Sequence, residues 1–103
     1  MVRLEQLKSF LVQNPGDLFS RHALAMELIK WGDDAGAQVL LEEILEMDPG
    51  YIGSYYHLGK LLERRGASAS ALEIYQRGMA AARAAGDMHA YGELNTAYQL
   101  AED

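Results

Sequence analysis

The stretch HALAMELIKWGDDAGAQVLLEEI, residues 22–44, returns 34 positions later as YHLGKLLERRGASASALEIYQRG, residues 56–78. Several large apolar, small and turn residues of the first stretch each align with a residue of the same class in the second stretch. The matched pairs are Leu24 with Leu58, Ala25 with Gly59, Leu28 with Leu62, Gly32 with Gly66, Ala37 with Ala71 and Leu41 with Tyr75. The same interval separates the prolines of two similar Asx-Pro-Gly segments, Pro15 and Pro49. Such agreement at a fixed interval indicates a chain built from repeated units.

Each period predicts a hairpin of two helices. Apolar residues at helical spacing predict a first helix over 18–31. Gly32 ends this helix, because a residue without a Cβ atom can adopt a left-handed conformation. Asp33 or Asp34 can then cap the next helix by accepting hydrogen bonds from its free backbone N–H groups. The second helix is expected to end at Met47, just before Asp-Pro-Gly, since the residue before a proline avoids helical angles.

Small residues mark the places where two helices are expected to approach closely. Ala37 and Ala71 recur at the same position of each unit. Gly59 lies inside a predicted helix, where glycine costs ~1 kcal/mol relative to alanine. Close packing against a neighbouring helix is the simplest reason for a glycine there.

This pattern resembles the tetratricopeptide repeat, a helix-turn-helix unit of the same length. The second copy matches best, and the residues that carry its match are Tyr55, Leu58, Gly59, Leu62, Ala71 and Tyr75. Two positions depart from the family pattern: Arg21 replaces the large aromatic residue of the first copy, and Gly78 stands where alanine is usual. The resemblance implies an all-α fold, a right-handed superhelical stack of antiparallel helix pairs.

The units divide the chain, residues 1–103, as one domain with about six helices. The expected parts are an N-terminal half-unit helix over 1–15, a first repeat over 18–51, a second repeat over 52–87 and a C-terminal capping helix over 88–103. In the last part Tyr91, Leu94 and Tyr98 keep the apolar register with a shift of two residues. Polar residues in the two terminal helices suit caps on a short stack.

Composition excludes several classes of function. The 103 residues include no cysteine. Their net charge of -6 argues against nucleic acid as a partner, because phosphate binding needs clustered cations. We interpret the basic group of Lys60, Arg64 and Arg65 as a solvated helix end. The sequence shows neither a signal peptide nor an apolar run long enough for a membrane. We therefore expect a cytoplasmic protein that does not bind membranes.

Catalytic patterns are missing from the sequence. The segment Gly-Asp-Asp-Ala-Gly lacks the Lys-Ser/Thr that follows a phosphate-binding loop. We do not expect any of the serines to have a histidine that acts as its base. We therefore expect neither an enzyme, nor a bound cofactor, nor a metal site.

The resemblance implies a concave groove, lined by the first helix of each pair, that holds a peptide or a helix of a partner. The residues expected to line it and to bind that partner are Phe19, His22, Met26, Ile29, Lys30, Tyr56, His57, Lys60, Arg64 and His89. Phe19, Met26 and Ile29 are too apolar for a fully solvated surface. They either pack against their neighbours or a second copy of the chain, or form an exposed patch for a partner.

The function we expect is a protein-interaction module or assembly adaptor whose partner is another protein or peptide. One alternative is a self-associating module, with a homodimer as a possible form. A second alternative is a metal-binding or pH-responsive site built on His22, His57 and His89. Protonation of a histidine-lined groove near pH ~6.5 would strengthen binding of an acidic peptide.

Overall fold

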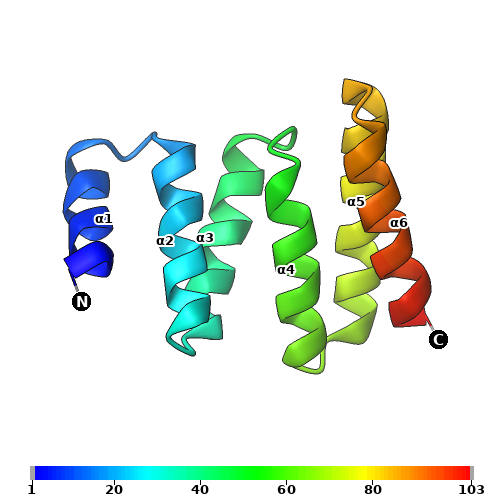
Figure 1. The fold of residues 1–103 in the computed structure, drawn as a ribbon, viewed down its shortest axis with the longest axis horizontal. Coiled ribbons are helices and arrows are strands. Elements are labelled where there is room, and N and C mark those ends of the chain that lie inside the picture. The colour runs from blue at the N-terminus through cyan, green and yellow to red at the C-terminus, as the bar shows by residue number, and fades with distance from the viewer. Residues whose placement is uncertain (1, 103) are drawn as a thin grey trace.

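The computed structural model describes residues 2–102, which form six α-helices in a row (Figure 1). The helices are α1 (Val2–Gln13), α2 (Leu18–Lys30), α3 (Asp34–Met47), α4 (Gly53–Arg64), α5 (Ser68–Ala85) and α6 (Met88–Glu102). Their order along the long axis of the molecule follows their order in the chain, and the molecule measures 39 × 29 × 19 Å. The all-α stack of hairpins predicted from the 34-residue interval is confirmed.

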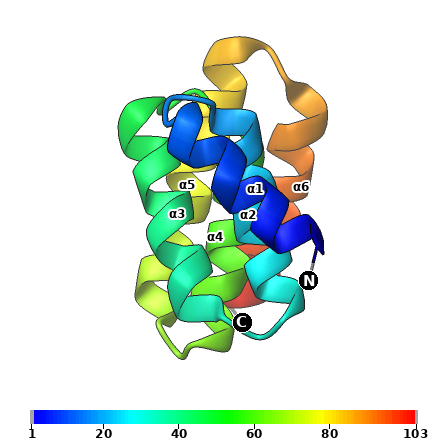
Figure 2. The same ribbon diagram turned by 90° about the vertical axis from the view of Figure 1, so that its left-hand side faces the viewer.

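Each helix packs chiefly against its neighbours in the chain. We call α2 with α3 the first hairpin and α4 with α5 the second hairpin. Among residues 2–102, the one further pair of helices with more than marginal contact is α4 with α6, and this contact is smaller than those between neighbours. Seen along the stack, α3 and α5 lie towards one side and α6 towards the other (Figure 2). The stack therefore has two layers, and α2, α4 and α6 form the layer that we call the first-helix face.

The turns that follow α2, α4 and α5 are glycine turns. Gly32, Gly66 and Gly86 have φ values of 87°, 80° and 72°, the left-handed conformation that favours glycine at the end of a helix. The side chain of Asp33 then caps α3 by accepting a hydrogen bond of 2.9 Å from the backbone N–H of Gly36. The predicted stop at Gly32 and the predicted cap are both confirmed.

The loops between hairpins contain the two prolines, and each proline carbonyl accepts a hydrogen bond from the helix that follows. The Arg21 Nη2 group donates to the Pro15 carbonyl oxygen at 2.6 Å. One repeat later, the Tyr55 hydroxyl donates to the Pro49 carbonyl oxygen. Arg21 therefore makes the same tether as the aromatic residue that it replaces.

The core lies between the helix layers and contains the small residues singled out above. Ala37 and Ala71 are completely buried. A Cβ atom on Gly59 would lie 2.1 Å from the Cε1 atom of Tyr75. Since real Cβ atoms do not approach other heavy atoms so closely, the close crossing expected at Gly59 is confirmed.

The last helix joins the stack differently from the others. Helix α5 has 18 residues, compared with 14 in α3, and ends at Gly86 without a proline loop. The longer helix accounts for the two-residue shift in the apolar register of α6. No helix within residues 2–102 is both long and apolar enough to cross a bilayer.

Candidate functional site

The first-helix face carries a cavity of about 600 Å³ between α4 and α6. Its lining residues are Tyr56, Lys60, Met88, His89, Gly92, Glu93, Thr96, Ala97 and Leu100. Three residues predicted for the groove, Tyr56, Lys60 and His89, come together here. The remaining lining residues belong to α6, which flanks the groove rather than filling it.

Large apolar side chains at this cavity face solvent. Met88 is 59% exposed and Leu100 is 68% exposed. The Lys60 ammonium beside them lies 3.9 Å from the Glu63 carboxylate, a weak ion pair. Glu93 is paired with the His89 ring at 3.6 Å. The cavity thus combines exposed apolar surface with a loosely held cation.

A second group of side chains, which we call the histidine cluster, lies where α2 meets α4. Its members are His22, Tyr51, Ser54 and His57. The His22 Nδ1 atom is 3.0 Å from the Ser54 Oγ atom. The His22 ring centroid is 5.5 Å from that of His57 and 5.8 Å from that of Tyr51. The cluster adjoins the cavity, because the His57 ring also lies 5.6 Å from the Tyr56 ring.

Burial lowers the pKa of both histidines of the cluster. The pKa of His22 falls below its ordinary value of 6.5 because the ring is partly buried and because His57 is nearby. The pKa of His57 falls because of burial and then the Arg64 charge, an effect that Glu93 partly offsets. Both rings are therefore mainly neutral at pH 7, and their protonation lies below the pH near 6.5 that the sequence suggested.

The third histidine is separate from this cluster. The His89 side chain is 87% exposed and its ring faces Glu93 on its own helix. The structure thus brings together two of the three histidines. Residues 2–102 contain no group of three or more His, Asp or Glu residues that could hold a metal ion.

The contact between Ser54 and His22 was not predicted from the sequence. The two residues lie on different helices, 32 positions apart in the chain. Ser54 is completely buried, so a substrate has no access to its Oγ atom. The pair is therefore a structural hydrogen bond between α2 and α4, not a nucleophile and its base.

The other predicted groove residues on α2 have different surroundings. Met26 and Ile29 are half-buried and pack against the core, whereas Phe19 is 73% exposed. The exposed Lys30 holds its ammonium 5.9 Å from the centre of the Trp31 ring. The apolar patch predicted on α2 is thus divided between core packing and solvent.

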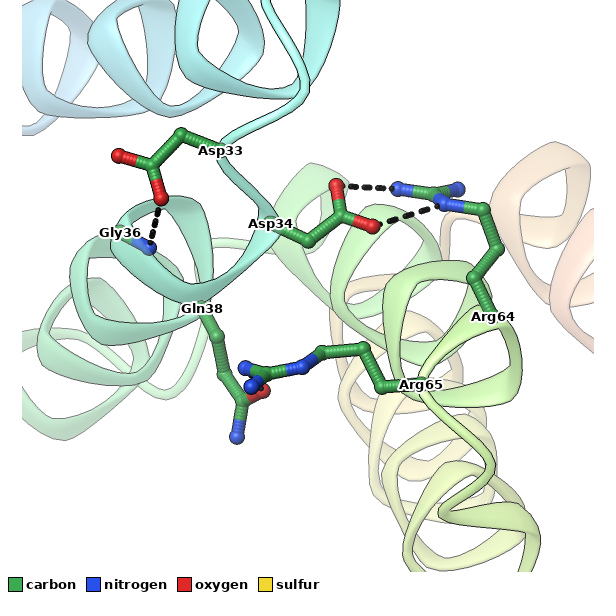
Figure 3. A network of polar contacts seen from close by, with 6 residues as sticks. All are labelled: Asp33, Asp34, Gly36, Gln38, Arg64 and Arg65. Atoms are coloured by element: carbon green, nitrogen blue, oxygen red, sulfur yellow. Dashed lines mark hydrogen bonds and ion pairs between the residues drawn. The ribbon is translucent and has the colours of Figure 1, made fainter.

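Arg64, predicted to bind the partner, contacts the first hairpin instead (Figure 3). Its guanidinium makes two hydrogen bonds to the Asp34 carboxylate, of 3.1 and 3.2 Å. Arg65 donates to the Gln38 side chain at 2.8 Å. The basic group at the end of α4 therefore ties the two hairpins together at their turns.

The residues of α6 that line the cavity were also missed, apart from His89. Met88, Thr96 and Leu100 belong to the unit whose register is shifted by two residues. The sequence did contain this information, because Thr96 follows Lys60 by 36 positions, the same interval that separates Leu94 from Leu58. Applying this shift to the whole face would have found them.

Comparison with solved structures finds close matches for this arrangement. The solution structure of a tetratricopeptide repeat domain protein from Salinibacter ruber has a TM-score of 0.82 and 43% sequence identity, covering 85% of this chain and 89% of that chain. A crystal structure from the same organism, also titled a tetratricopeptide repeat domain protein, has a TM-score of 0.80 at 43% identity, covering 84% of this chain and 97% of that one. The solution structure of a protein from Bordetella parapertussis has a TM-score of 0.83 at 27% identity, covering 96% of this chain and 86% of that one.

No family model and no curated protein matches the chain. The solved structures, together with the six helices, confirm the fold class and the resemblance inferred from the sequence.

Proposed function

Because this chain belongs to the tetratricopeptide repeat family, we propose that it is a protein-interaction module whose first-helix face binds a segment of another protein. The observation that carries this proposal is the cavity between α4 and α6, with Met88 and Leu100 exposed at it. Exposed apolar side chains that gather on one face of a protein commonly mark an interface.

The dimensions of this surface suit a short segment of a partner. Met88 and Leu100 are twelve residues apart on one helix, which at 1.5 Å per residue corresponds to about 18 Å. An extended segment of about six residues, or a helix of about twelve, covers that length. The volume of about 600 Å³ has room for several of its side chains.

Charges on the face favour a segment that carries a carboxylate. Of the acidic side chains here, Glu63 accepts a hydrogen bond from the Tyr75 hydroxyl, and Glu93 lies 3.6 Å from the His89 ring, an ion pair when that ring is protonated. Within the part of the chain that the structure describes, the Lys60 ammonium has only its long contact with Glu63. We propose apolar contacts to Tyr56, Met88 and Leu100, with a carboxylate of the partner at Lys60.

This function is non-covalent binding without a cofactor. The buried Ser54 supports it, because the serine and histidine in contact cannot reach a substrate. We also propose that α6 acts as a polar cap. Asn95 supports that role, since this polar residue occupies the position of α6 that is equivalent to the buried Ala25 of α2 and the buried Gly59 of α4.

Peptide display against the purified chain tests the binding proposal. Peptides selected on the wild type should bind the Leu100→Glu variant at least about tenfold more weakly, because a carboxylate would be placed against their apolar side chains. Val39→Glu is the matched control, since Val39 is 54% exposed on α3, in the other layer. If both variants bind equally well, or if display selects no peptide, the proposal is wrong.

Self-association is a second candidate, favoured by a specific observation on the N-terminal part of the stack. Val12 is 81% exposed and Phe19 is 73% exposed, and a second copy of the chain would cover such residues. Sedimentation over a concentration series would then show a dimer that Phe19→Ser weakens. A monomer throughout the series excludes this candidate.

A further inference from the structure

We propose that the histidine cluster makes the packing of α2 against α4 sensitive to acid, so that protonation of His22 and His57 moves the two hairpins apart. The consequence for partner binding rests on the proposed function. The movement itself does not.

The two rings lie where one hairpin meets the other. Their centroids are 5.5 Å apart, with His22 on α2 and His57 on α4. Both side chains are half-buried, so water screens a charge on them less than it screens one on an exposed ring. Two imidazolium ions at this separation repel each other, and each also loses hydration through burial.

The backbone gives this pair of rings leverage over the hairpins. Helices α2 and α4 approach each other much less than α2 approaches α3 or α4 approaches α5. The hydrogen bond between His22 and Ser54 and the contact between the rings therefore supply much of the direct link between α2 and α4. Each hairpin is tightly packed within itself, and α3 packs against α4. Repulsion between the rings therefore opens the α2–α4 side of the junction, while the α3–α4 packing and the Arg64–Asp34 pair hold the other side.

Groups around the pair act in both directions. Arg64 opposes protonation of His57, whereas Glu93 on α6 favours it. Tyr51 contacts His22 from the α3–α4 loop, and Asp17 and Asp48 lie near Tyr51. The contact with Glu93 is the weaker influence, because burial and Arg64 prevail at His57 and lower its pKa.

The sign of the pH effect follows from these directions. A histidine whose pKa is lower in the folded state binds a proton more readily when its surroundings open. The closed packing is therefore fully stable above the ordinary histidine pKa of 6.5 and loses stability as the pH falls through the lower values of the folded state. On the first-helix face the His57 ring lies against the Tyr56 ring, so opening at His57 would displace this proposed contact residue, and partner binding would weaken in acid.

Spin labels on the two hairpins test the movement without a partner. The chain has no cysteine, so Val39→Cys on α3 and Ala80→Cys on α5 give one label on each hairpin, both at exposed positions. In the wild-type background the distance distribution between the labels should broaden or shift between pH 7.5 and pH 5. With His22→Gln and His57→Gln added it should stay unchanged, because glutamine keeps a hydrogen-bonding side chain and carries no charge.

His89→Gln is the matched control, since it removes a histidine that lies outside the cluster. This variant should respond as the wild type does. Circular dichroism at both pH values verifies that each variant is folded. NMR titration of the histidine rings adds a second measurement: His57→Gln should raise the titration midpoint of His22, because the neighbouring charge is gone.

Three results would overturn the proposal. The first is a label distance that does not change with pH in the wild type. The second is loss of the response in the His89→Gln variant. The third is a His22 midpoint that stays the same without His57. A partner that binds equally at both pH values while the label distance changes would contradict the effect on binding and leave the movement supported.

Discussion

At one pair of equivalent positions the first hairpin has Ala25 and Leu41, whereas the second hairpin has Gly59 and Tyr75. All four residues are buried completely or nearly so. The second hairpin gives up a methyl group on α4 and gains an aromatic ring on α5. Because interiors are packed near the density of crystals, the two changes belong together, and the repeat conserves the filled space rather than the residues.

The two equivalent residues that tether the loops, Arg21 and Tyr55, differ in charge. In the first hairpin Arg21 donates to the Pro15 carbonyl and pairs with Glu43 at 2.8 Å. In the second hairpin the Tyr55 hydroxyl donates to the Pro49 carbonyl. One geometrical task is thus performed by a cation in one unit and by a phenol in the next.

The partner on the second helix changes accordingly. Residue 43 of the first hairpin corresponds to Arg77 of the second, and the Arg77 guanidinium lies 5.8 Å from the centre of the Tyr55 ring. An ion pair is replaced by a cation–π contact between the same two positions. Gly78 stands where alanine is usual because Tyr55 packs directly against it: a Cβ atom on Gly78 would lie 2.6 Å from the Tyr55 Cβ atom.

The largest expected effect comes from breaking the size exchange in the second hairpin. Gly59→Ala should destabilise the fold by about 3 kcal/mol, because the added methyl group meets a ring that is fully buried and bonded to Glu63. Adding Tyr75→Leu, which reproduces the pair found in the first hairpin, should restore at least about half of that loss. Urea denaturation of the two variants measures both values.

Ala25→Gly is the matched change in the first hairpin. It should cost only about 1 kcal/mol, the usual price of glycine in a helix. Equal losses for Gly59→Ala and Ala25→Gly, or a Tyr75→Leu change that rescues nothing, would show that the two positions are independent.

The second prediction concerns the position that faces Tyr55. Gly78→Ala should destabilise by about 2 kcal/mol, because the methyl group meets the Tyr55 Cβ atom and also the Leu94 Cδ1 atom at 3.0 Å. In the first hairpin the equivalent residue is the fully buried Ile44, so the same backbone position accepts a large side chain there. A neutral Gly78→Ala result in thermal denaturation would mean that α5 and α6 shift readily.

The third prediction compares the two tethers. Tyr55→Phe removes one hydrogen bond and keeps the ring, so it should cost about 1 kcal/mol. Arg21→Met removes the tether and the ion pair, but it also removes the Arg21 Nε atom, which is buried and has no hydrogen-bond partner among the described residues. We therefore expect Arg21→Met to cost no more than Tyr55→Phe, and a loss above about 2 kcal/mol would show that the ion pair with Glu43 is a major contribution.

The smallest expected effect moves a helix cap from one hairpin to the other. Ala67 precedes α5 without a side-chain cap, at the position where the first hairpin has Asp33. Ala67→Asp should stabilise the fold by about 0.5 kcal/mol, whereas Asp33→Ala should destabilise it by about 1 kcal/mol. Shifts of the melting temperature in these directions would support the view that the two turns are equivalent. A lower melting temperature for Ala67→Asp would contradict it.

Much of the fold could be predicted because its determinants are local. The left-handed glycine at Gly32, the cap at Asp33 and the stop before Pro49 depend on a few adjacent residues. The close approach at Gly59 could also be predicted, since a helical glycine has little other reason to be present. The 34-residue interval could not show which side chain fills the space opposite Gly59, because that side chain, Tyr75, belongs to the other helix of the hairpin.

The candidate site was less predictable because it depends on contacts between units. Periodicity places Arg64 on the groove side, but only the structure shows that Asp34 holds its guanidinium. Periodicity places His22 and His57 on adjacent helices, but not in contact through Ser54. Leu100 was not predicted because the longer α5 changes the repeat interval from 34 to 36 residues for the last helix.

The contact of α4 with α6 has a consequence for the order in which the molecule folds. Nearly all helix packing joins neighbours in the chain, and contacts between segments close in sequence form rapidly because little loop entropy is lost. The α4–α6 contact is the exception among residues 2–102, because it joins two segments that are separated in the chain by the whole of α5. The cavity that holds Lys60 and Leu100 is therefore completed late in folding, and a nascent chain presents it only after α6 has been synthesised and has docked.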